Sequence, residues 1–237
     1  MNDEQKRLDH IASWYLGEQL DFDRRMVRFR YEALRPHLKG ASALELGSAE
    51  GEMTRLLLPH FEHLVIVDAA GDLLDHVADS PRLTKVRSLF EAFEPDERFD
   101  TVVMEHVLEH VADPVALLQK ARSWLAPDGR ILVGVPNAHS IHRLAAVKMG
   151  LLSNPAQLNA RDLQVGHRRV YDPETLCTQI KSAGLTLLER GGVFFKPVSN
   201  QQMEEQWSEE MIEGFHKLGR DFPDYAAEIY AVCTVAV

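Results

Sequence analysis

Several features are scarce in this sequence, and each scarcity excludes a class of protein. Two cysteines exclude a disulfide scaffold, and Cys177 and Cys233 both lie in apolar patterns typical of inert core thiols. No run of 18 apolar residues occurs, and the first residues lack the apolar segment of a signal peptide, so we expect a cytoplasmic protein without a membrane span. Positive charge is in deficit: the net charge of -10 argues against a nucleic-acid surface.

The remaining composition is that of an ordered globular protein. With 45% apolar residues, 237 residues suffice for one α/β domain with a sizeable core. Short apolar runs alternate with helical patterns, which predicts a parallel sheet with helices on both faces. No internal repeat or low-complexity linker occurs, so we expect a single domain over residues 1–237. The expected strands are 43–46, 64–67, 84–87, 99–104, 130–136, 185–190 and 230–237.

The stretch from Ala43 to Gly51 contains the first signal of a ligand site. An apolar run ends near Glu45, and Gly47 and Gly51 follow before a helical segment. Glycine is needed where the backbone turns sharply and approaches a ligand without a Cβ in the way. Asp68 ends the next apolar run, where an acid can accept hydrogen bonds from both hydroxyls of a ribose. The pattern predicts a nucleotide-type ligand at the carboxyl ends of the strands.

The glycine pattern differs from that of dinucleotide-binding proteins, because Ala49 occupies the middle position and no third glycine follows. The strings ELGSAEG (45–51), EHVLEHVADP (105–114) and LAPDGR (125–130) together resemble the class I S-adenosylmethionine-dependent methyltransferases. The likeness covers about residues 40–190 and is greatest to the small-molecule group typified by ubiquinone-biosynthesis O-methyltransferases. It implies S-adenosylmethionine as cofactor. The fold it implies is Rossmann-like, with a seven-stranded, mostly parallel sheet, an antiparallel last strand and helices on both faces.

The resemblance also implies which residues hold the cofactor. Leu89 and Phe90 would form an apolar slot along the adenine ring, although Phe90 is as well explained as plain core. Glu105 would flank the methionine portion. The residues predicted to bind the cofactor are Glu45, Gly47, Ser48, Gly51, Asp68, Ala69, Leu89, Phe90 and Glu105.

The string from His106 to His110 also matches the H-x-x-E-H zinc pattern of one protease class. That pattern requires a continuous helix, in which two imidazoles four residues apart share the metal. Here a predicted strand ends immediately before the string, and Asp113-Pro114 stops any helix within a turn. We therefore expect no metal at this position.

The resemblance places His106 at the end of the fourth strand, facing the substrate. A neutral hydroxyl or amine acceptor needs a nearby base, and an imidazole titrates near neutral pH. His106 is therefore the predicted catalytic residue. The alternative is that His106 donates a hydrogen bond that orients an acidic acceptor, which would need no base and would instead be bound by arginines.

An N-terminal segment and two insertions are expected to cover the site. Residues 1–38 are predicted to form a lid, or else a helix packed on the body, and insertions at about 138–170 and 196–224 follow two strands. The arginines of the lid are either a solvated face or include one, Arg28 or Arg30, that pairs with a carboxylate of the cofactor or substrate. By resemblance the His-x-x-x-Tyr segment from His167 to Tyr171 faces the mouth of the active site. Packing of Tyr171 and capping of a loop by His167 explain the two side chains equally well. The predicted substrate-binding residues are Arg28, His139, His167, Arg168 and Tyr171.

In the second insertion an apolar stripe recurs every four residues, at Met203, Trp207, Met211 and Phe215. This spacing predicts one helix from about residue 201 to 218. Such a stripe is usually core packing, and here we expect it to cover the substrate mouth or a partner subunit.

These observations predict a methyltransferase that acts on a small molecule, with oxygen as the acceptor atom by resemblance. The alternatives are an N-methyltransferase, a non-catalytic protein that binds S-adenosylmethionine, and an NAD-dependent oxidoreductase. We expect no nucleic-acid or membrane partner, and a monomer or homodimer.

Overall fold

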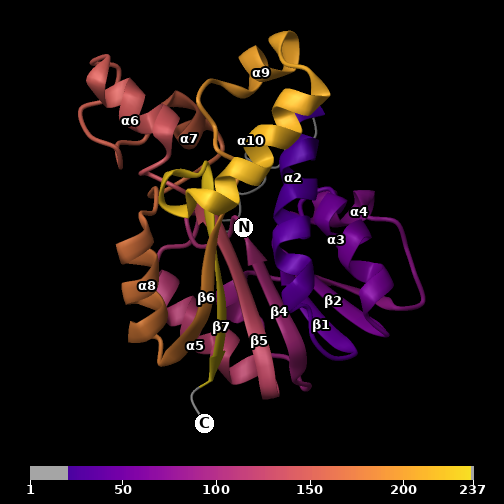
Figure 1. The fold of residues 1–237 in the computed structure, drawn as a ribbon. Coiled ribbons are helices and arrows are strands. Elements are labelled where there is room, and N and C mark those ends of the chain that lie inside the picture. The colour runs from indigo at the N-terminus through magenta and orange to yellow at the C-terminus, as the bar shows by residue number, and fades with distance from the viewer. Residues whose placement is uncertain (1–20, 236–237) are drawn as a thin grey trace.

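The computed structural model describes residues 21–235 (Figure 1). The expected first helix of the lid and the last two residues of the expected final strand lie outside this range. The described chain has a central sheet with helices on both faces and a group of helices above one end of the strands.

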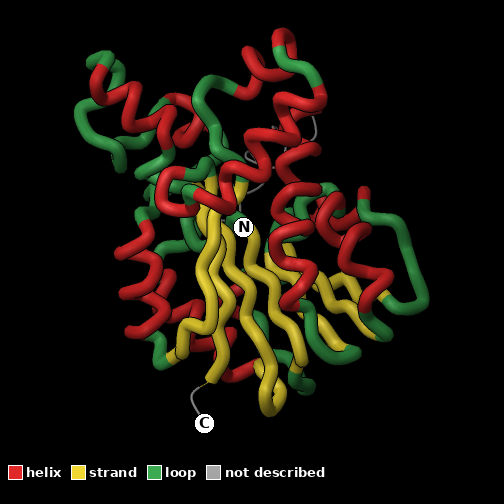
Figure 2. The backbone as a smooth tube through the Cα atoms, viewed as in Figure 1, coloured by secondary structure: helices red, strands yellow, loops and turns green. Residues whose placement is uncertain are grey.

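The sheet has seven strands in the order β3-β2-β1-β4-β5-β7-β6. Figure 2 shows the strands as one central sheet with helices around it. The first five strands pair in parallel, whereas β7 is antiparallel to both β5 and β6. The expected mostly parallel sheet with an antiparallel last strand is therefore confirmed. The strands are β1 Ser42–Leu46, β2 His63–Asp68, β3 Leu83–Arg87, β4 Phe99–Glu105, β5 Leu125–Pro136, β6 Leu185–Val193 and β7 Glu228–Val235.

Side chains alternate between the two faces of the sheet, and each face has its own core. Leu44 and Leu46 of β1 pack on one face with α5 (Pro114–Trp124) and α8 (Pro173–Ser182). Ala43 packs on the other face with the helices that follow β1 and β2. Because successive strand residues point in opposite directions, Glu45 lies on the same face as Ala43. The carboxyl group of Glu45 therefore lies on the face of the sheet that the helix after the glycine loop covers.

Helices cover the two faces as the alternating pattern predicts (Figure 1). α5 and α8 lie on one side, and α2, α3 and α4 on the other. The start of α8 is set by residues next to it in the sequence, since Asp172 accepts a hydrogen bond from the Thr175 amide and Pro173 occupies the first turn. The remaining helix bounds are α2 Asp21–Leu34, α3 Glu52–Leu57, α4 Gly71–His76, α6 Ile141–Lys148, α7 Ala160–Gln164, α9 Asn200–Gln206 and α10 Glu209–Asp221.

The prediction of one helix from residue 201 to 218 is wrong. The segment forms α9 and α10, separated at Trp207, whose backbone is extended. Ser208 accepts a hydrogen bond from the Met211 amide and starts the second helix, which has Glu209 and Glu210 in its first turn. The apolar stripe therefore splits: Met203 is buried, whereas the side chain of Met211 is 44% exposed.

The second insertion contains the helices α9 and α10 and packs on α2. The two insertions together are called the cap. Phe22, Met26 and Phe29 of α2 form a third core cluster with Phe194, together with Met203 and Ile212 of the two cap helices. The ring of Phe194 lies edge-on to Phe22 at 5.3 Å and stacks on Phe29 at 5.7 Å between centroids. The second insertion and the described part of the predicted lid are therefore one packed unit.

Among the helices of residues 21–235, none combines the length and the apolar character that a membrane span requires.

The close approach of α10 to the turn after β6 depends on Gly219. A Cβ added there would lie 2.4 Å from the backbone nitrogen of Phe194, a residue whose φ of 59° marks a tight turn. We expect Gly219→Ala to lower the free energy of unfolding by about 1–3 kcal/mol, because backbone atoms cannot move aside cheaply.

Gly214 on the same helix is the matched control for this prediction. A Cβ at Gly214 meets nothing within 4 Å, so Gly214→Ala is expected to stabilise the protein by up to about 1 kcal/mol. Urea unfolding of both variants measures the two effects. Equal effects of the same sign would show that the contact with Phe194 does not constrain α10.

Candidate active site

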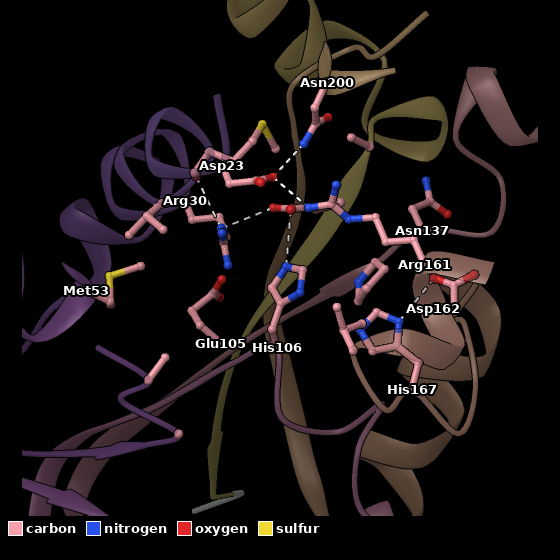
Figure 3. Close-up of a pocket in the computed structure, with 18 of the residues that line it drawn as sticks. Asp23, Arg30, Met53, Glu105, His106, Asn137, Arg161, Asp162, His167 and Asn200 are labelled. Atoms are coloured by element: carbon pink, nitrogen blue, oxygen red, sulfur yellow. Dashed lines mark hydrogen bonds and ion pairs between the residues drawn. The ribbon is translucent and has the colours of Figure 1, made fainter. Parts of the chain in front are cut away.

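A cavity of about 310 Å³ lies at the carboxyl ends of the parallel strands (Figure 3). The loops after β1 and β4 form its floor, and α2 forms one wall. The first insertion and the residues between β6 and β7 close the other side. The cavity thus lies between the sheet and the cap, which is where ligands collect in open parallel sheets.

The glycine loop after β1 has the backbone that its sequence predicts. Gly47 and Gly51 have φ values of 74° and 86°, which favour glycine, and Ala49 between them has a φ of 45°. A Cβ on Gly47 would lie 3.2 Å from the Val107 side chain. The hydroxyl of Ser48 is buried and has no hydrogen-bond partner among the described residues. The loop therefore presents backbone and an available hydroxyl to the cavity.

Two buried carboxyl groups lie beside this loop. Glu45 accepts a 2.6 Å hydrogen bond from the Thr54 hydroxyl, and burial raises its pKa to about 8 against the effect of that bond. Glu105 lines the same cavity, and burial raises its pKa to about 7 although Arg30 and His106 act to lower it. Within the described chain, neither carboxyl oxygen of Glu105 has a hydrogen-bond partner.

The other predicted cofactor residues are beside or behind the loop. Asp68 ends β2 and accepts a 2.9 Å hydrogen bond from the Ala70 amide, and burial raises its pKa. The ring of Phe90 lies 3.7 Å from where a Cβ of Gly47 would be. The cavity wall includes Glu45, Gly47, Ser48 and Glu105, but not Gly51, Asp68, Ala69, Leu89 or Phe90.

His106 lies between two carboxylates, which changes its expected chemistry. Its Nδ1 is 3.1 Å from Glu109 Oε1, and its Nε2 is 3.2 Å from Glu228 Oε1. Burial and the charge of Arg30 disfavour the imidazolium, but the two carboxylates outweigh them and raise the pKa of His106 to about 10. Its φ of 53° shows a backbone held in a conformation that costs a non-glycine residue energy. A ring already protonated at neutral pH favours the donor over the base.

Glu109 is the buried partner of this imidazolium. Burial alone would raise its pKa, but His106, and after it His110 and His167, lower the pKa of Glu109 to about 2. Near neutral pH the His106 imidazolium therefore carries a positive charge between the negative carboxylates of Glu109 and Glu228.

Glu228 and Arg30 belong to this site, and neither is among the predicted site residues. Glu228 begins β7, and its carboxylate is 3.4 Å from Nε of Arg30 on α2. Burial opposes ionisation of Glu228, yet Arg30 and His106 lower its pKa. The arginine-rich pattern of α2 pointed to Arg28 or Arg30 without separating them, and no local pattern marks Glu228.

Of the predicted substrate-binding residues, only His167 lines the cavity. Arg28 is half exposed and pairs with Glu213 at 2.6 Å, outside the cavity. His139 and Arg168 are exposed, and Tyr171 is fully buried with its hydroxyl 2.9 Å from Gln179. Tyr171 therefore packs in the core around α5 and α8, which is the alternative to its predicted role in substrate binding.

Other polar residues of the cap meet across the cavity (Figure 3). Arg161 of α7 donates to Asp23 of α2 at 2.9 Å, and Asn200 of α9 donates to the same oxygen at 2.7 Å. Asp162 receives hydrogen bonds from Arg143 at 3.0 Å and His167 at 3.1 Å. These contacts join three segments that are remote in sequence.

The residues after β4 do not form the helix that the zinc pattern requires, since the segment following Glu105 is a series of turns. Ligand atoms of Glu109, His110 and His167 do lie within 4.8 Å of one another, a spacing that could hold a metal ion. Glu109 already pairs with His106, and His167 with Asp162. The absence of a metal stays a prediction.

Fold and site together define a class I S-adenosylmethionine-dependent methyltransferase. A family model described as a methyltransferase domain matches residues 16–190, and the chain belongs to this family. S-adenosylmethionine is accordingly its methyl donor. The buried, unpartnered hydroxyl of Ser48 and carboxyl of Glu105 beside the glycine loop suit such a polar ligand.

Curated relatives and solved structures agree with this class. The chain is 28% identical over 187 residues to ubiquinone biosynthesis O-methyltransferase of Xanthomonas euvesicatoria, covering 74% of this chain and 75% of the relative. The Xylella fastidiosa (strain 9a5c) protein of the same name is also 28% identical, with 74% and 73% covered. The methyltransferase CcbJ from Streptomyces caelestis has a TM-score of 0.66 at 18% identity, and both chains are covered completely. The N-methyltransferase NodS from Bradyrhizobium japonicum, solved with S-adenosylhomocysteine, has 0.59 at 18%, again over both whole chains.

The raised pKa of His106 predicts a dependence of stability on pH. A raised folded-state pKa contributes stability that is fully present below the unfolded value of 6.5 and is lost as the pH rises through about 10. Between these values the wild type should lose stability relative to His106→Gln by up to about 1.4 kcal/mol per pH unit. Urea unfolding at several pH values measures the difference.

Other buried groups titrate in the same range, and comparison with the variant removes their contribution. His76→Gln, on the exposed side of α4, is the control and should follow the wild type. Parallel curves for wild type and His106→Gln would show that His106 is not the buried imidazolium described above.

Proposed function

We propose that this methyltransferase transfers the methyl group to an oxygen atom of a small molecule held between the sheet and the cap. The observation that carries the proposal is the pair of opposite charges at the cavity, the Glu228 carboxylate 3.2 Å from the His106 imidazolium. A carboxylate can take the proton of a hydroxyl, and a neighbouring imidazolium stabilises the oxygen from which it leaves. The O-methyltransferase relatives support the same acceptor atom.

The glycine loop end of the cavity suits the cofactor. Glu45, Ser48 and Glu105 would hold it, together with the backbone of Gly47, and Asp68 at the neighbouring strand end would accept from its ribose. Bound there, S-adenosylmethionine supplies a methyl group that is already activated for displacement. The chain needs only to align the acceptor, exclude water and remove one proton.

Glu228 is the proposed proton acceptor. Its Oε1 faces His106, and its Oε2 lies 3.4 Å from Nε of Arg30 but accepts no hydrogen bond from the described residues, so Oε2 can still accept one from an acceptor hydroxyl. The lowered pKa makes Glu228 a weak base. A weak base suffices, because a hydroxyl oxygen becomes strongly acidic as it forms its new bond to carbon.

His106 is the proposed positioning donor. As an imidazolium paired with Glu109, it keeps a positive charge 3.2 Å from the Glu228 carboxylate that would take the proton. The fixed geometry requires no reorganisation when the oxygen loses its proton. This assignment replaces the expectation that His106 itself acts as the base.

A panel of matched acceptors tests the proposal. Catechol, 2-aminophenol and 1,2-diaminobenzene, with analogues that bear acidic groups, are incubated with the enzyme and S-adenosylmethionine. Mass spectrometry then locates the transferred methyl group. We expect methylation of hydroxyl oxygen. Methylation confined to amino nitrogen, with the hydroxyl-only compounds unchanged, would make the protein an N-methyltransferase.

A further inference from the structure

The cap side of the cavity contains a cation that forms no ion pair with any described residue. Among the described residues, four Lys and Arg side chains line the cavity, and three of them form ion pairs. Arg30 pairs with Glu228 at 3.4 Å, Arg143 with Asp162 at 3.0 Å, and Arg161 with Asp23 at 2.9 Å. Lys196 is the fourth, and within the described part of the chain its ammonium has no hydrogen bond and no carboxylate within 4.0 Å.

Lys196 lines the cavity from the turn that follows β6. It comes after Phe194, whose positive φ turns the chain, and the amide of Phe195 donates to the Phe215 carbonyl of α10 at 2.9 Å. The residue is partly buried, and desolvation and the charge of Arg161 lower the pKa of Lys196 to about 8. Glu228 and Asp23 oppose this effect without reversing it. A partly buried cation that forms no ion pair with the described residues is stabilised by a ligand that supplies negative charge.

Lys196 belongs to the segment between β6 and β7, which lines the cavity from the cap. Asn200 of the same segment donates to Asp23 at 2.7 Å, and the same carboxylate pairs with Arg161 of α7 at 2.9 Å. The glycine loop lines the cavity from the end of β1. The lysine is therefore on the cap side of the cavity, away from the strand that carries the glycine loop.

We infer that the methyl acceptor bears an anionic group, such as a carboxylate, remote from the atom that is methylated, and that Lys196 binds this group. The inference rests on the proposed function for the identity of the ligand as acceptor. It adds an element of substrate specificity, because an acceptor with a carboxylate binds to Lys196 and the corresponding neutral amide does not. The same cavity then holds an acceptor by its anionic end at Lys196 and presents its hydroxyl to Glu228.

Titration of Lys196 tests the site independently of methyl transfer. The lysines of the protein loaded with S-adenosylhomocysteine are reductively methylated with ¹³C, and the Lys196 signal is assigned by its loss in Lys196→Met. Benzoate, formate and inorganic phosphate are the anionic probes, and benzamide is the neutral control. We expect at least one anion to raise the pKa of Lys196 by about one unit or more, with no effect of benzamide.

Matched controls separate the outcomes. Lys148→Met, at the exposed end of α6, should remove a different signal that no probe shifts. If no anion shifts the Lys196 signal, the inference is wrong. If S-adenosylhomocysteine alone raises its pKa and the anions add nothing, Lys196 serves the cofactor carboxylate and the inference is also wrong. Binding of S-adenosylhomocysteine checks that Lys196→Met is folded, and Lys196→Gln replaces it for assignment if it is not.

Turnover then separates this inference from the proposed function. For an acceptor that is methylated, replacing its carboxylate by a carboxamide should lower kcat/KM at least about tenfold in the wild type but not in Lys196→Met. Methylation at nitrogen would overturn the proposed acceptor atom and leave the anion site standing. Equal turnover of acid and amide by the wild type would overturn the anion site alone.

Discussion

Glu228→Gln is expected to lower kcat by about 10²- to 10⁴-fold, the range for loss of a positioned proton-transfer group. Glutamine preserves the shape of the side chain but cannot take the hydroxyl proton. Binding of S-adenosylhomocysteine should change little, because Glu228 begins β7 on the acceptor side of His106. Single-turnover kinetics with the acceptor found in the panel, together with calorimetry, measure the two quantities.

Glu213→Gln is the control for this substitution. Glu213 lies on α10 and pairs with Arg28 outside the cavity, so its loss should leave kcat unchanged. If Glu228→Gln turned over like the wild type, another group would have to receive the proton. An equal loss of cofactor affinity and kcat would instead assign Glu228 to cofactor binding.

His106→Gln distinguishes the positioning donor from the base. A base with a pKa of about 10 would make turnover rise with pH throughout the neutral and mildly alkaline range. A permanently protonated donor adds no pH dependence of its own in this range, so the profiles of the wild type and the variant should run parallel. The variant should also retain part of the activity, because glutamine can still donate. A tenfold rise per pH unit in the wild type, abolished in His106→Gln, would restore the base.

Asp68→Ala is expected to weaken binding of S-adenosylhomocysteine by about 10- to 150-fold. The carboxyl group ends β2 beside the glycine loop, and loss of one charge-assisted hydrogen bond costs about 1.5–3 kcal/mol. Part of the effect is indirect, since Asp68 also accepts from the Ala70 amide and helps to shape the loop. Isothermal titration calorimetry gives the dissociation constants.

Two comparisons sharpen this measurement. Asp68→Asn keeps the acceptor that holds the Ala70 amide and removes the charge, so its affinity should fall between those of Asp68→Ala and the wild type. Asp72→Ala, an exposed acid on α4, should bind like the wild type. Unchanged affinity of Asp68→Ala would remove Asp68 from the cofactor site.

Much of the fold and of the cofactor end was determined by the sequence. Short apolar runs that alternate with helical patterns predict the sheet that is observed, and the alternation of side chains along a strand places Leu44 and Leu46 on one face and Ala43 on the other. Gly47 and Gly51 have the positive φ values that their turn requires. These features are local, because a strand or turn is specified by residues next to one another in the chain. The same holds for the start of the helix at Pro173.

The acceptor end was decided by the tertiary structure. His106 follows the end of β4, as predicted. Its charge depends on Glu109, three residues further along the chain, and on Glu228, which β7 brings to it. Arg28 and Arg30 are alike in sequence, and only the packing of α2 turns Arg30 toward the cavity and Arg28 toward Glu213. A pKa depends on every charge within a few ångströms, and those charges come from segments that only folding unites. The sequence by itself therefore determined the class of the protein, and the tertiary structure decided which side chains face the cavity.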